Sequence, residues 1–188
     1  MGALKLPEEL PYYSYDDYSQ WQGQWEIIDG IPYAMSPMPK GRHQRISNNL
    51  AFEFQKNLKE CKRCKAYMPV DWEVDKHTIL QPDNLVVCDL EDDDFIKLTK
   101  PPVLVVEILS PSTALKDKNI KYRIYEEAGV KYYIIVDPDT LSATVYELKE
   151  GRYVELGSFT SKDSCRLYIE HSEGCCELSV DFEEVFDI

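Results

Sequence analysis

Residues 101–110 read PPVLVVEILS, a run in which a single acidic residue, Glu107, interrupts Val, Leu and Ile. A segment that is apolar at both odd and even positions is typical of a strand buried on both faces of a sheet. An isolated carboxylate in such an interior costs roughly several kcal/mol even after relaxation, so it takes up a proton or pairs with a cation. The run therefore predicts a central strand and requires a partner for Glu107.

The composition is that of a globular protein with a core of its own. The chain has 188 residues, of which 44% are hydrophobic and 29% are charged, and this suits one domain over residues 1–188. No apolar stretch approaches the roughly 20 residues of a membrane span, and the N-terminus MGALKLPEELPYY lacks the pattern of a signal peptide. We therefore expect no membrane association and a cytoplasmic location.

The charge of the chain is unevenly distributed. The net charge of −13 opposes nonspecific binding to nucleic acids, because like charges repel at long range. Residues 36–66 nevertheless carry eight Lys or Arg against two Glu. This stretch permits two interpretations, an ordinary solvated face or a surface that meets a polyanion.

Hydrophobic periodicity and turn residues predict a core in the order helix, three strands, helix, strand. Apolar residues recur every four positions from Ile46 to Leu58, which indicates an amphipathic helix over residues 43–58. A second helix is expected from a cap at residue 112 or 113 to about residue 128, with Gly129 in the left-handed conformation after it. The expected strands are residues 25–28, 31–35, 66–74, 79–88, 103–109, 132–136, 144–148 and 152–156, with a short helix over 14–21 and further short strands in the acidic tail.

Asp83 is the first candidate to share a site with Glu107. It follows Pro82, which cannot occupy a central position in a sheet, so Asp83 is expected at the end of the apolar strand NLVVC. If the two strands are neighbours, Asp83 and Glu107 converge at one edge of the sheet and repel each other unless a cation joins them. Ligands that are all oxygens suit Mg²⁺ or Mn²⁺.

Lys121 is the second candidate, because Asp117, Lys121 and Tyr125 lie on one stripe of the second expected helix. The stripe is polar at its start and apolar at its end, which indicates that its first turns overhang a cleft at the edge of the sheet. An ammonium–carboxylate contact at about 4 Å is worth roughly 4 kcal/mol before desolvation at an effective dielectric near 20. A buried Glu107–Lys121 ion pair without a catalytic role remains the alternative.

These residues give the chain a resemblance to the Uma family of restriction endonucleases, a branch of the PD-(D/E)XK nuclease superfamily. The similarity extends over about residues 25–148. It is carried by QPD at residues 81–83, VEILSPST at 106–113, Asp117 with Lys121, and YEEAGVKYYIIVDP at 125–138. The superfamily lysine is expected two residues after Glu107, where this chain has Leu109. In the Uma-like pattern the lysine looks to have moved to the following helix, as Lys121.

The resemblance implies a restriction-endonuclease-like α/β fold with a mixed sheet flanked by helices. The core would cover about residues 40–148, with an N-terminal helix and hairpin over 12–36 and an acidic C-terminal β extension over 149–188. Asp83 and Glu107 would bind the metal, Lys121 would be the catalytic lysine, and Glu26 and His43 match family positions that line the site. A lone His at a helix start is more often a cap or a surface residue, so both interpretations of His43 stay open.

The expected function is Mg²⁺- or Mn²⁺-dependent hydrolysis of phosphodiester bonds, with DNA as the partner and a homodimer as the form that cuts both strands. A non-catalytic nucleic-acid-binding or structural protein on the same fold is the alternative, since a fold does not guarantee chemistry. Contacts to the DNA phosphates are expected from Lys40, Arg42, Arg45, Lys116, Lys118 and Arg123.

The cysteines do not form a recognisable disulfide framework, and we expect reduced thiols. The pair Cys61-Lys-Arg-Cys64 has the spacing of a zinc site or of a dithiol redox motif, but no second pair stands at matching spacing. His171 and Cys175 are the additional ligands that the sequence offers.

Overall fold

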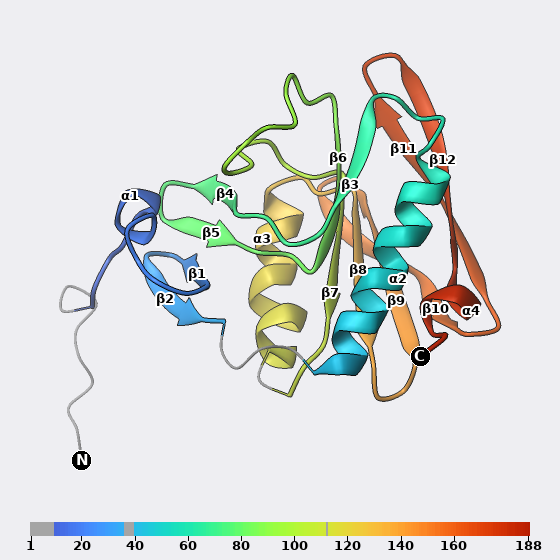
Figure 1. Ribbon diagram of the computed structural model, residues 1–188, viewed down its shortest axis with the longest axis horizontal. Coiled ribbons are helices and arrows are strands. Elements are labelled where there is room, and N and C mark those ends of the chain that lie inside the picture. Colours follow the sequence, from blue (N-terminus) through green and yellow to red (C-terminus); the bar gives the residue numbers. More distant parts are fainter. Residues whose placement is uncertain (1–9, 36–39, 112) are drawn as a thin grey trace.

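A computed structural model describes residues 10–35, 40–111 and 113–188 of the chain, and a six-stranded mixed sheet forms its centre (Figure 1). The run with Glu107 is strand β7, Leu104–Ile108. It pairs antiparallel with β6, Asn84–Cys88, and parallel with β8, Tyr132–Asp137, so it is an internal strand, as expected. The outer strands are β3 (Cys64–Tyr67) beyond β6, and β9 (Ser142–Lys149) and β10 (Arg152–Thr160) beyond β8.

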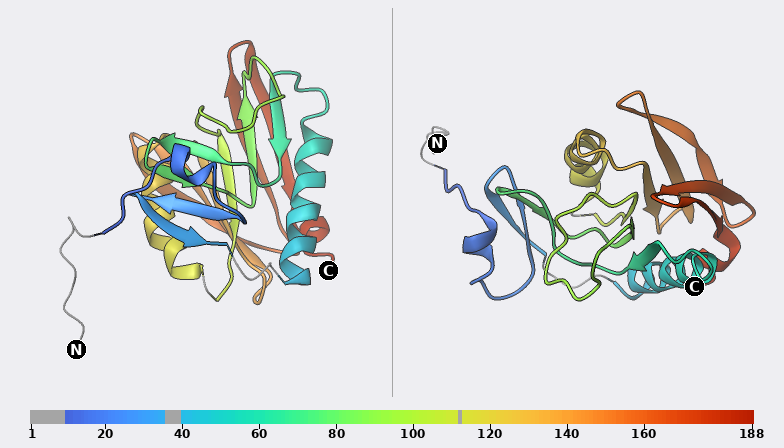
Figure 2. Two further views of the ribbon diagram at one scale, coloured as in Figure 1. Left: turned by 60° about the vertical axis from the view of Figure 1, so that its left-hand side comes forward. Right: turned by 90° about the horizontal axis from the view of Figure 1, so that it is seen from above.

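Helices cover both faces of this sheet, which confirms the expected layers. Seen from above, helix α2, Gly41–Asn57, and helix α3, Tyr122–Glu127, lie on opposite sides of the strands (Figure 2). Even-numbered residues such as Val86 and Val106 belong to the core under α2, and odd-numbered residues such as Leu85 and Val105 belong to the core under α3. Glu107 has the odd parity and therefore faces the α3 side.

A separate four-stranded sheet stands beside the α3 face (Figure 1). The expected hairpin around Asp29-Gly30 is confirmed, and its strands are β1 (Trp25–Ile28) and β2 (Ile31–Ala34). Helix α1, Tyr15–Tyr18, precedes it and is capped by Ser14. The other two strands are β4 (Trp72–Asp75) and β5 (Thr78–Leu80).

The expectation of continuous strands over residues 66–74 and 79–88 is wrong. The chain leaves the central sheet after β3, forms β4 and β5 in the smaller sheet, and returns as β6. Pro69 and Pro82 lie in the two breaks, and proline has no N–H to donate to a sheet. The detour carries the smaller sheet, and Glu26 with it, against the centre of the molecule.

The helix that follows β7 differs in form from the expected continuous α-helix. Residues Lys116–Lys121 are a π-helical segment, and α3 continues from it to Glu127. Of the two residues proposed to cap it, position 112 lies outside the described residues. Gly129 has φ of +82° after the helix, as expected of a left-handed C-terminal position. The wider π turn places both Asp117 and Lys121 in the interior.

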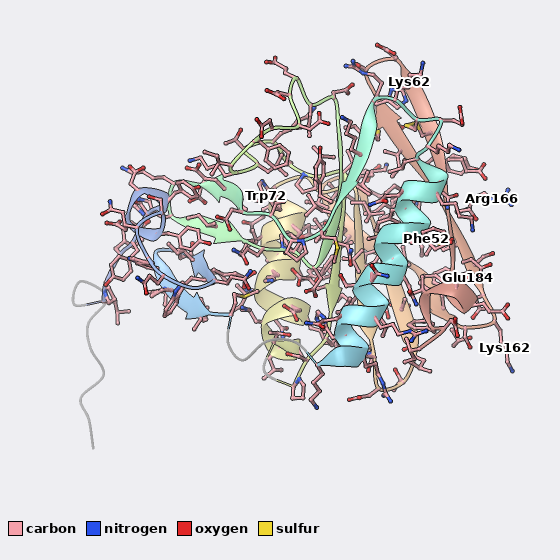
Figure 3. The ribbon with its side chains drawn as sticks, viewed as in Figure 1. Phe52, Lys62, Trp72, Lys162, Arg166 and Glu184 are labelled. Atoms are coloured by element: carbon pink, nitrogen blue, oxygen red, sulfur yellow. A yellow bond between two sulfur atoms is a disulfide. The ribbon has the colours of Figure 1, made fainter. Side chains whose placement is uncertain are left out.

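The acidic C-terminal part forms the hairpin β11 (Ser164–His171) and β12 (Gly174–Asp181), followed by α4 (Phe182–Val185). Its apolar residues, including Leu167 and Leu178, join the core on the α2 side of the central sheet. The outer surface of α2 remains open there, as Figure 3 shows for Phe52, which is 60% exposed. Among the described residues, no helix has the length and apolarity that a membrane span requires.

Four cysteines differ from the expectation of reduced thiols. The structure joins Cys61 to Cys176 and Cys64 to Cys88 as disulfides. Of the remaining two, Cys165 is buried and Cys175 is exposed.

Candidate active site

Glu107 has a cationic partner, and this partner is Lys121, as predicted. The Lys121 Nζ atom lies 2.8 Å from Glu107 Oε1, and the Tyr125 hydroxyl donates a second hydrogen bond to the same oxygen. Trp72 holds the Tyr125 ring by stacking on it, with the ring centroids 5.8 Å apart; Figure 3 labels Trp72 beside the smaller sheet. Because both bonds use Oε1, the second carboxylate oxygen of Glu107 is left for a further ligand.

Glu26 enters the same cluster from strand β1. Its Oε1 atom lies 2.6 Å from Lys121 Nζ, and its Oε2 atom lies 2.6 Å from Lys116 Nζ. The backbone N–H of Gln81 also donates to Oε1, at 3.1 Å. The QPD segment is therefore connected to Glu26 through its first residue, and the smaller sheet contributes a buried acid to the site.

Asp83 and His43 form the more exposed side of the cluster. Asp83 Oδ2 accepts a hydrogen bond from the backbone N–H of Ile108 at 2.8 Å, which fixes this carboxylate beside the residue that follows Glu107. His43 Nε2 lies 3.2 Å from the same oxygen. Ser47 of α2 and Asn84 of β6 tie the helix to this strand, since Asn84 donates to the Ser47 carbonyl at 3.0 Å. The side chains of Asp83 and His43 are 17% and 12% exposed.

Asp117 is a further acid of the site that the sequence analysis placed on the stripe but not among the site residues. Its side chain is 1% exposed, and its Oδ1 atom lies 3.8 Å from Lys121 Nζ. Neither carboxylate oxygen has a hydrogen-bond partner of normal geometry among the described residues, although the Thr113 side chain opposes the rise in the pKa of Asp117 that burial causes. A buried carboxylate in this condition favours a proton or a metal ion. The signal that could have identified it is its spacing of four residues from Lys121.

The acids outnumber the cations in the cluster. Four carboxylates, on Glu26, Asp83, Glu107 and Asp117, meet the two ammonium groups of Lys116 and Lys121 and the imidazole of His43. Even with His43 protonated, ionisation of every acid leaves an excess of one negative charge. The arrangement is therefore incomplete without either a proton or an additional cation.

The pKa shifts follow from this imbalance. Burial raises the pKa of Glu107 well above its ordinary value, against the lowering effect of Lys121. Burial likewise raises the pKa of Asp117. Burial would also raise the pKa of Glu26, but the charges of Lys121 and Lys116 outweigh it and lower that pKa. Glu26 is thus the acid that the lysines neutralise, while Glu107 and Asp117 are the acids that tend to hold a proton.

The acidic neighbours of Lys121 and of His43 together outweigh the effect of burial on the pKa of each group. Burial would lower the pKa of Lys121, but the charges of Glu107, Glu26 and Asp117 raise it, so this amine stays protonated. Burial would also lower the pKa of His43, but the hydrogen bond to Asp83 and the charge of Asp83 raise it.

The same donor set fits a divalent cation that prefers oxygen. Asp83 and Glu107 each keep one oxygen outside the contacts just described, and Asp117 keeps two. The carboxylates are not already arranged as a complete metal site, since no three carboxylates of the described residues bring one oxygen each within 4.8 Å of one another. Lys121 is only 2% exposed, so a ligand reaches the cluster from the side of Asp83 and His43 and not through the lysine.

The basic residues expected to contact DNA divide into three groups. Lys40, Lys118 and Arg123 are exposed. Arg42 and Arg45 are exposed too, but Arg42 contacts Asp139 at 3.8 Å and Arg45 donates to the Asp187 carbonyl at 3.0 Å. The amine of Lys116 points inward to Glu26, so it belongs to the acid cluster and has no free charge for a phosphate. Contact with DNA stays a prediction for all six.

Comparisons with known proteins agree with this architecture. The chain is 30% identical over 144 residues to the protein slr1290 of Synechocystis sp. (strain ATCC 27184 / PCC 6803 / Kazusa), an alignment that covers 73% of this chain and 75% of the relative. It also superposes, at 18% identity and a TM-score of 0.72, on the crystal structure of a "putative nuclease belonging to DUF820" from Anabaena variabilis ATCC 29413, over 92% of this chain and 97% of the other. That likeness confirms the restriction-endonuclease-like fold class.

Residues 15–170 match the model of a family described as "Putative restriction endonuclease". This range includes the strands and helices that carry Glu26, His43, Asp83, Glu107, Asp117 and Lys121. The chain therefore belongs to the Uma2 family of nucleases.

Proposed function

We propose that the protein is a metal-dependent endonuclease that hydrolyses phosphodiester bonds in DNA, with Mg²⁺ or Mn²⁺ as its cofactor. The observation that carries the proposal is the excess of carboxylates over cations in the cluster around Lys121, which lies at the end of β7 that Glu107 occupies. Asp83 lies on the side of this cluster that solvent reaches. An uncompensated acid cluster costs stability, and a site for a divalent cation is a physical reason to keep one.

The roles of the side chains follow from their positions. Asp83 and Glu107 would hold the ion, which supplies an activated water and neutralises the charge that develops on the phosphate. The ammonium of Lys121, fixed by Glu26 and Glu107, stabilises negative charge on the reacting group without a change in its own protonation. His43 orients the Asp83 carboxylate and, when protonated, offers a positive charge at the entrance.

DNA as the substrate rests on surface charge and on the family. Lys40, Lys118 and Arg123 are exposed cations on segments that flank the acid cluster, and they would contact the phosphate backbone in a salt-dependent manner. One site cuts one strand, so cleavage of both strands would use a homodimer or two successive nicks.

The test is cleavage of supercoiled plasmid with Mg²⁺ or Mn²⁺, compared with the same reaction in a chelator. Asp83→Asn and Glu107→Gln preserve the shape of each side chain and should abolish cleavage. Glu177→Gln, on the exposed face of β12, is the matched control and should cut like the wild type. Equal cleavage by all four proteins, or cleavage that the chelator leaves unchanged, would remove the assignment.

A non-catalytic binding or structural protein is the second candidate, and the burial of Lys121 favours it. Glu26, Glu107 and Lys121 already satisfy one another, as in an ion-pair core that has no ligand. Titration calorimetry with Mn²⁺ separates the two functions. A catalytic site should bind the ion in a manner that Asp83→Asn weakens, whereas an ion-pair core should give no saturable heat.

A further inference from the structure

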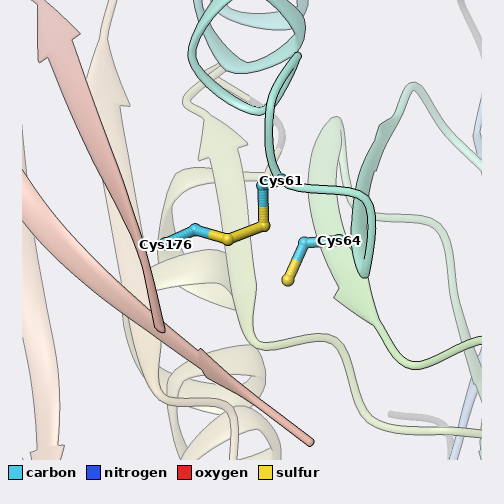
Figure 4. Close-up of side chains that lie close together, drawn as sticks. All are labelled: Cys61, Cys64 and Cys176. Atoms are coloured by element: carbon cyan, nitrogen blue, oxygen red, sulfur yellow. A yellow bond between two sulfur atoms is a disulfide. The ribbon is translucent and has the colours of Figure 1, made fainter. Parts of the chain in front are cut away.

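A cluster of sulfur atoms lies far along the molecule from the acids, at the opposite end of strands β6 and β3. The Sγ atoms of Cys61, Cys64 and Cys176 are all within 4.8 Å of one another (Figure 4). Cys88, the last residue of β6, adds a fourth sulfur, because it pairs with Cys64 across the strands and is bonded to it. Four of the six cysteines thus come together from three separate parts of the chain, although the Cys88 Sγ atom, bonded to Cys64, does not lie within 4.8 Å of all three other sulfurs.

The turn between α2 and β3 sets the geometry of the first two sulfurs. Cys61 and Cys64 are separated by two residues, and the Cys64 N–H donates to the Cys61 carbonyl at 3.4 Å. A tight turn of this kind directs both thiols to the same side, and two intervening residues are the usual spacing in structural zinc sites. Lys62 and Arg63 fill the turn, and the Arg63 guanidinium is paired with Asp89 and Glu173.

The third and fourth positions come from strands. Along β12 the side chains alternate, so Cys176 turns toward the cluster while its neighbour Cys175 is exposed. This corrects the expectation that Cys175 would be the added ligand. The His171 Nε2 atom lies 3.2 Å from Cys176 Sγ, where its N–H can donate to a thiolate. Cys61, Cys64 and Cys88 are buried, as ligands of closed structural zinc sites are.

The Cα distances distinguish the two cross-links: Cys61 and Cys176, with Cα atoms 6.0 Å apart, fit an ordinary disulfide, whereas Cys64 and Cys88 lie outside the usual range. Zinc with four thiolates has Zn–S bonds of about 2.3 Å, which places the sulfurs roughly 3.8 Å apart, so reduction must first break the Cys61–Cys176 and Cys64–Cys88 bonds and let the sulfurs of each pair separate by about 2 Å. The Cα atoms of Cys64 and Cys88 are 3.9 Å apart, whereas disulfides usually join Cα atoms about 4.4–6.8 Å apart.

We propose that the reduced chain binds one Zn²⁺ through the thiolates of Cys61, Cys64, Cys88 and Cys176. Four thiols bind the ion with release of four protons, and the site then carries a net charge of −2 that the His171 N–H and the nearby Lys62 oppose. The site is structural. It fastens the β11–β12 hairpin to the corner between α2 and β3, beside the ion pair of Arg63 with Asp89 at 2.8 Å and the hydrogen bond of Ser172 to Asp89 at 2.6 Å.

The test begins with the zinc content of the full chain, purified with a phosphine reductant, which supplies two electrons to each disulfide and yields two thiols. Elemental analysis should find about one zinc per chain. Replacement by Co²⁺ should give the intense visible bands of a tetrahedral ion and the near-ultraviolet charge-transfer absorption of thiolate ligands. This spectrum identifies the ligands in the wild-type protein, so the test does not depend on the folding of any variant.

Substitutions then assign the ligands. Cys61→Ser, Cys64→Ser, Cys88→Ser and Cys176→Ser should each lose the zinc or the four-sulfur Co²⁺ spectrum. Cys165→Ser and Cys175→Ser are the matched controls and should retain both. Zinc below about 0.1 per reduced chain, with no thiolate-to-Co²⁺ absorption, would overturn the proposal. Retention of zinc by Cys88→Ser, together with its loss in His171→Ala, would overturn the four-cysteine ligand set.

Discussion

The substitution Lys121→Met tests whether one amine holds the acid cluster together. Methionine has a similar length but no charge, so it removes the cation while it largely fills the space. Lys121 Nζ lies 2.6 Å from Glu26 Oε1, 2.8 Å from Glu107 Oε1 and 3.8 Å from Asp117 Oδ1. After the change, Lys116 is the ammonium group of the cluster that remains, and it contacts Glu26.

The expected loss follows from the burial of these groups. A single contact at 2.8 Å amounts to roughly 6 kcal/mol at an effective dielectric near 20, before the desolvation of either partner. Removal of one member of a buried ion pair costs about 3–5 kcal/mol, because it leaves an uncompensated charge. We expect the free energy of unfolding to fall by this amount near pH 7.5, measured by urea denaturation in a chelator.

The pH dependence gives the result a second readout. Burial already raises the pKa of Glu107 and that of Asp117, and loss of the cation raises them further. A group whose pKa is raised on folding stabilises the folded state at low pH, and this contribution is lost as the pH rises through the folded pKa. The deficit of Lys121→Met should therefore shrink near pH 5.

Two control variants make the outcome decisive. Lys118→Met, on the exposed side of the same helical segment, should change the free energy of unfolding by less than about 0.5 kcal/mol. Adding Glu107→Gln to Lys121→Met should recover part of the loss, since one uncompensated charge disappears. A loss below about 1 kcal/mol, or an equal loss at both pH values, would refute the reasoning.

Three further predictions concern single groups of the site and the surface. Asp117→Asn should raise the free energy of unfolding by about 1–2 kcal/mol in chelator near neutral pH, because it removes one of the excess buried acids around Lys121, one whose oxygens lack a hydrogen-bond partner; unchanged or lower stability in urea would count against it. Asp83→Asn should lower the pKa of His43 in an NMR titration, because the charge of Asp83 no longer opposes burial and only the weaker effects of the Ile108 backbone and Asp117 still do; an unchanged midpoint would show that the pair does not form. In the wild type, the His43–Asp83 pair makes its full contribution to the stability of the folded state below about pH 6.5, and this contribution is lost as the pH rises through the raised pKa of His43. Lys118→Ala and Arg123→Ala should each weaken DNA binding on all sequences and reduce the salt slope by about 1; an unaltered slope would exclude a phosphate contact.

The sequence was sufficient to predict the pairing of Glu107 with Lys121. The position of Glu107 in an apolar run and the helical spacing from Lys121 to Tyr125 depend on local periodicity, which the printed sequence displays directly. Glu107 and Lys121 are in contact as this periodicity predicted, and Asp83 lies at the end of its strand, as Pro82 predicted, beside Ile108.

Other features depend on contacts between distant segments, which periodicity does not encode. Pro69 and Pro82 marked breaks, but the apolar pattern on either side of them suits either sheet, so the transfer of β4 and β5 to the smaller sheet was missed. Asp117 was assigned to an overhanging helix start, whereas the π turn carries it inward. The sulfur cluster was missed because Cys88 and Cys176 approach Cys64 only after the sheet and the hairpin have formed.

The account is tested most directly by an anomalous difference map from crystals of the protein grown with saturating Mn²⁺. We predict a peak between the carboxylates of Asp83 and Glu107, with oxygen ligands at about 2.1 Å and with Lys121 still in contact with Glu26. A map with no peak at these acids, while their side chains keep the positions described above, would contradict the metal-dependent mechanism.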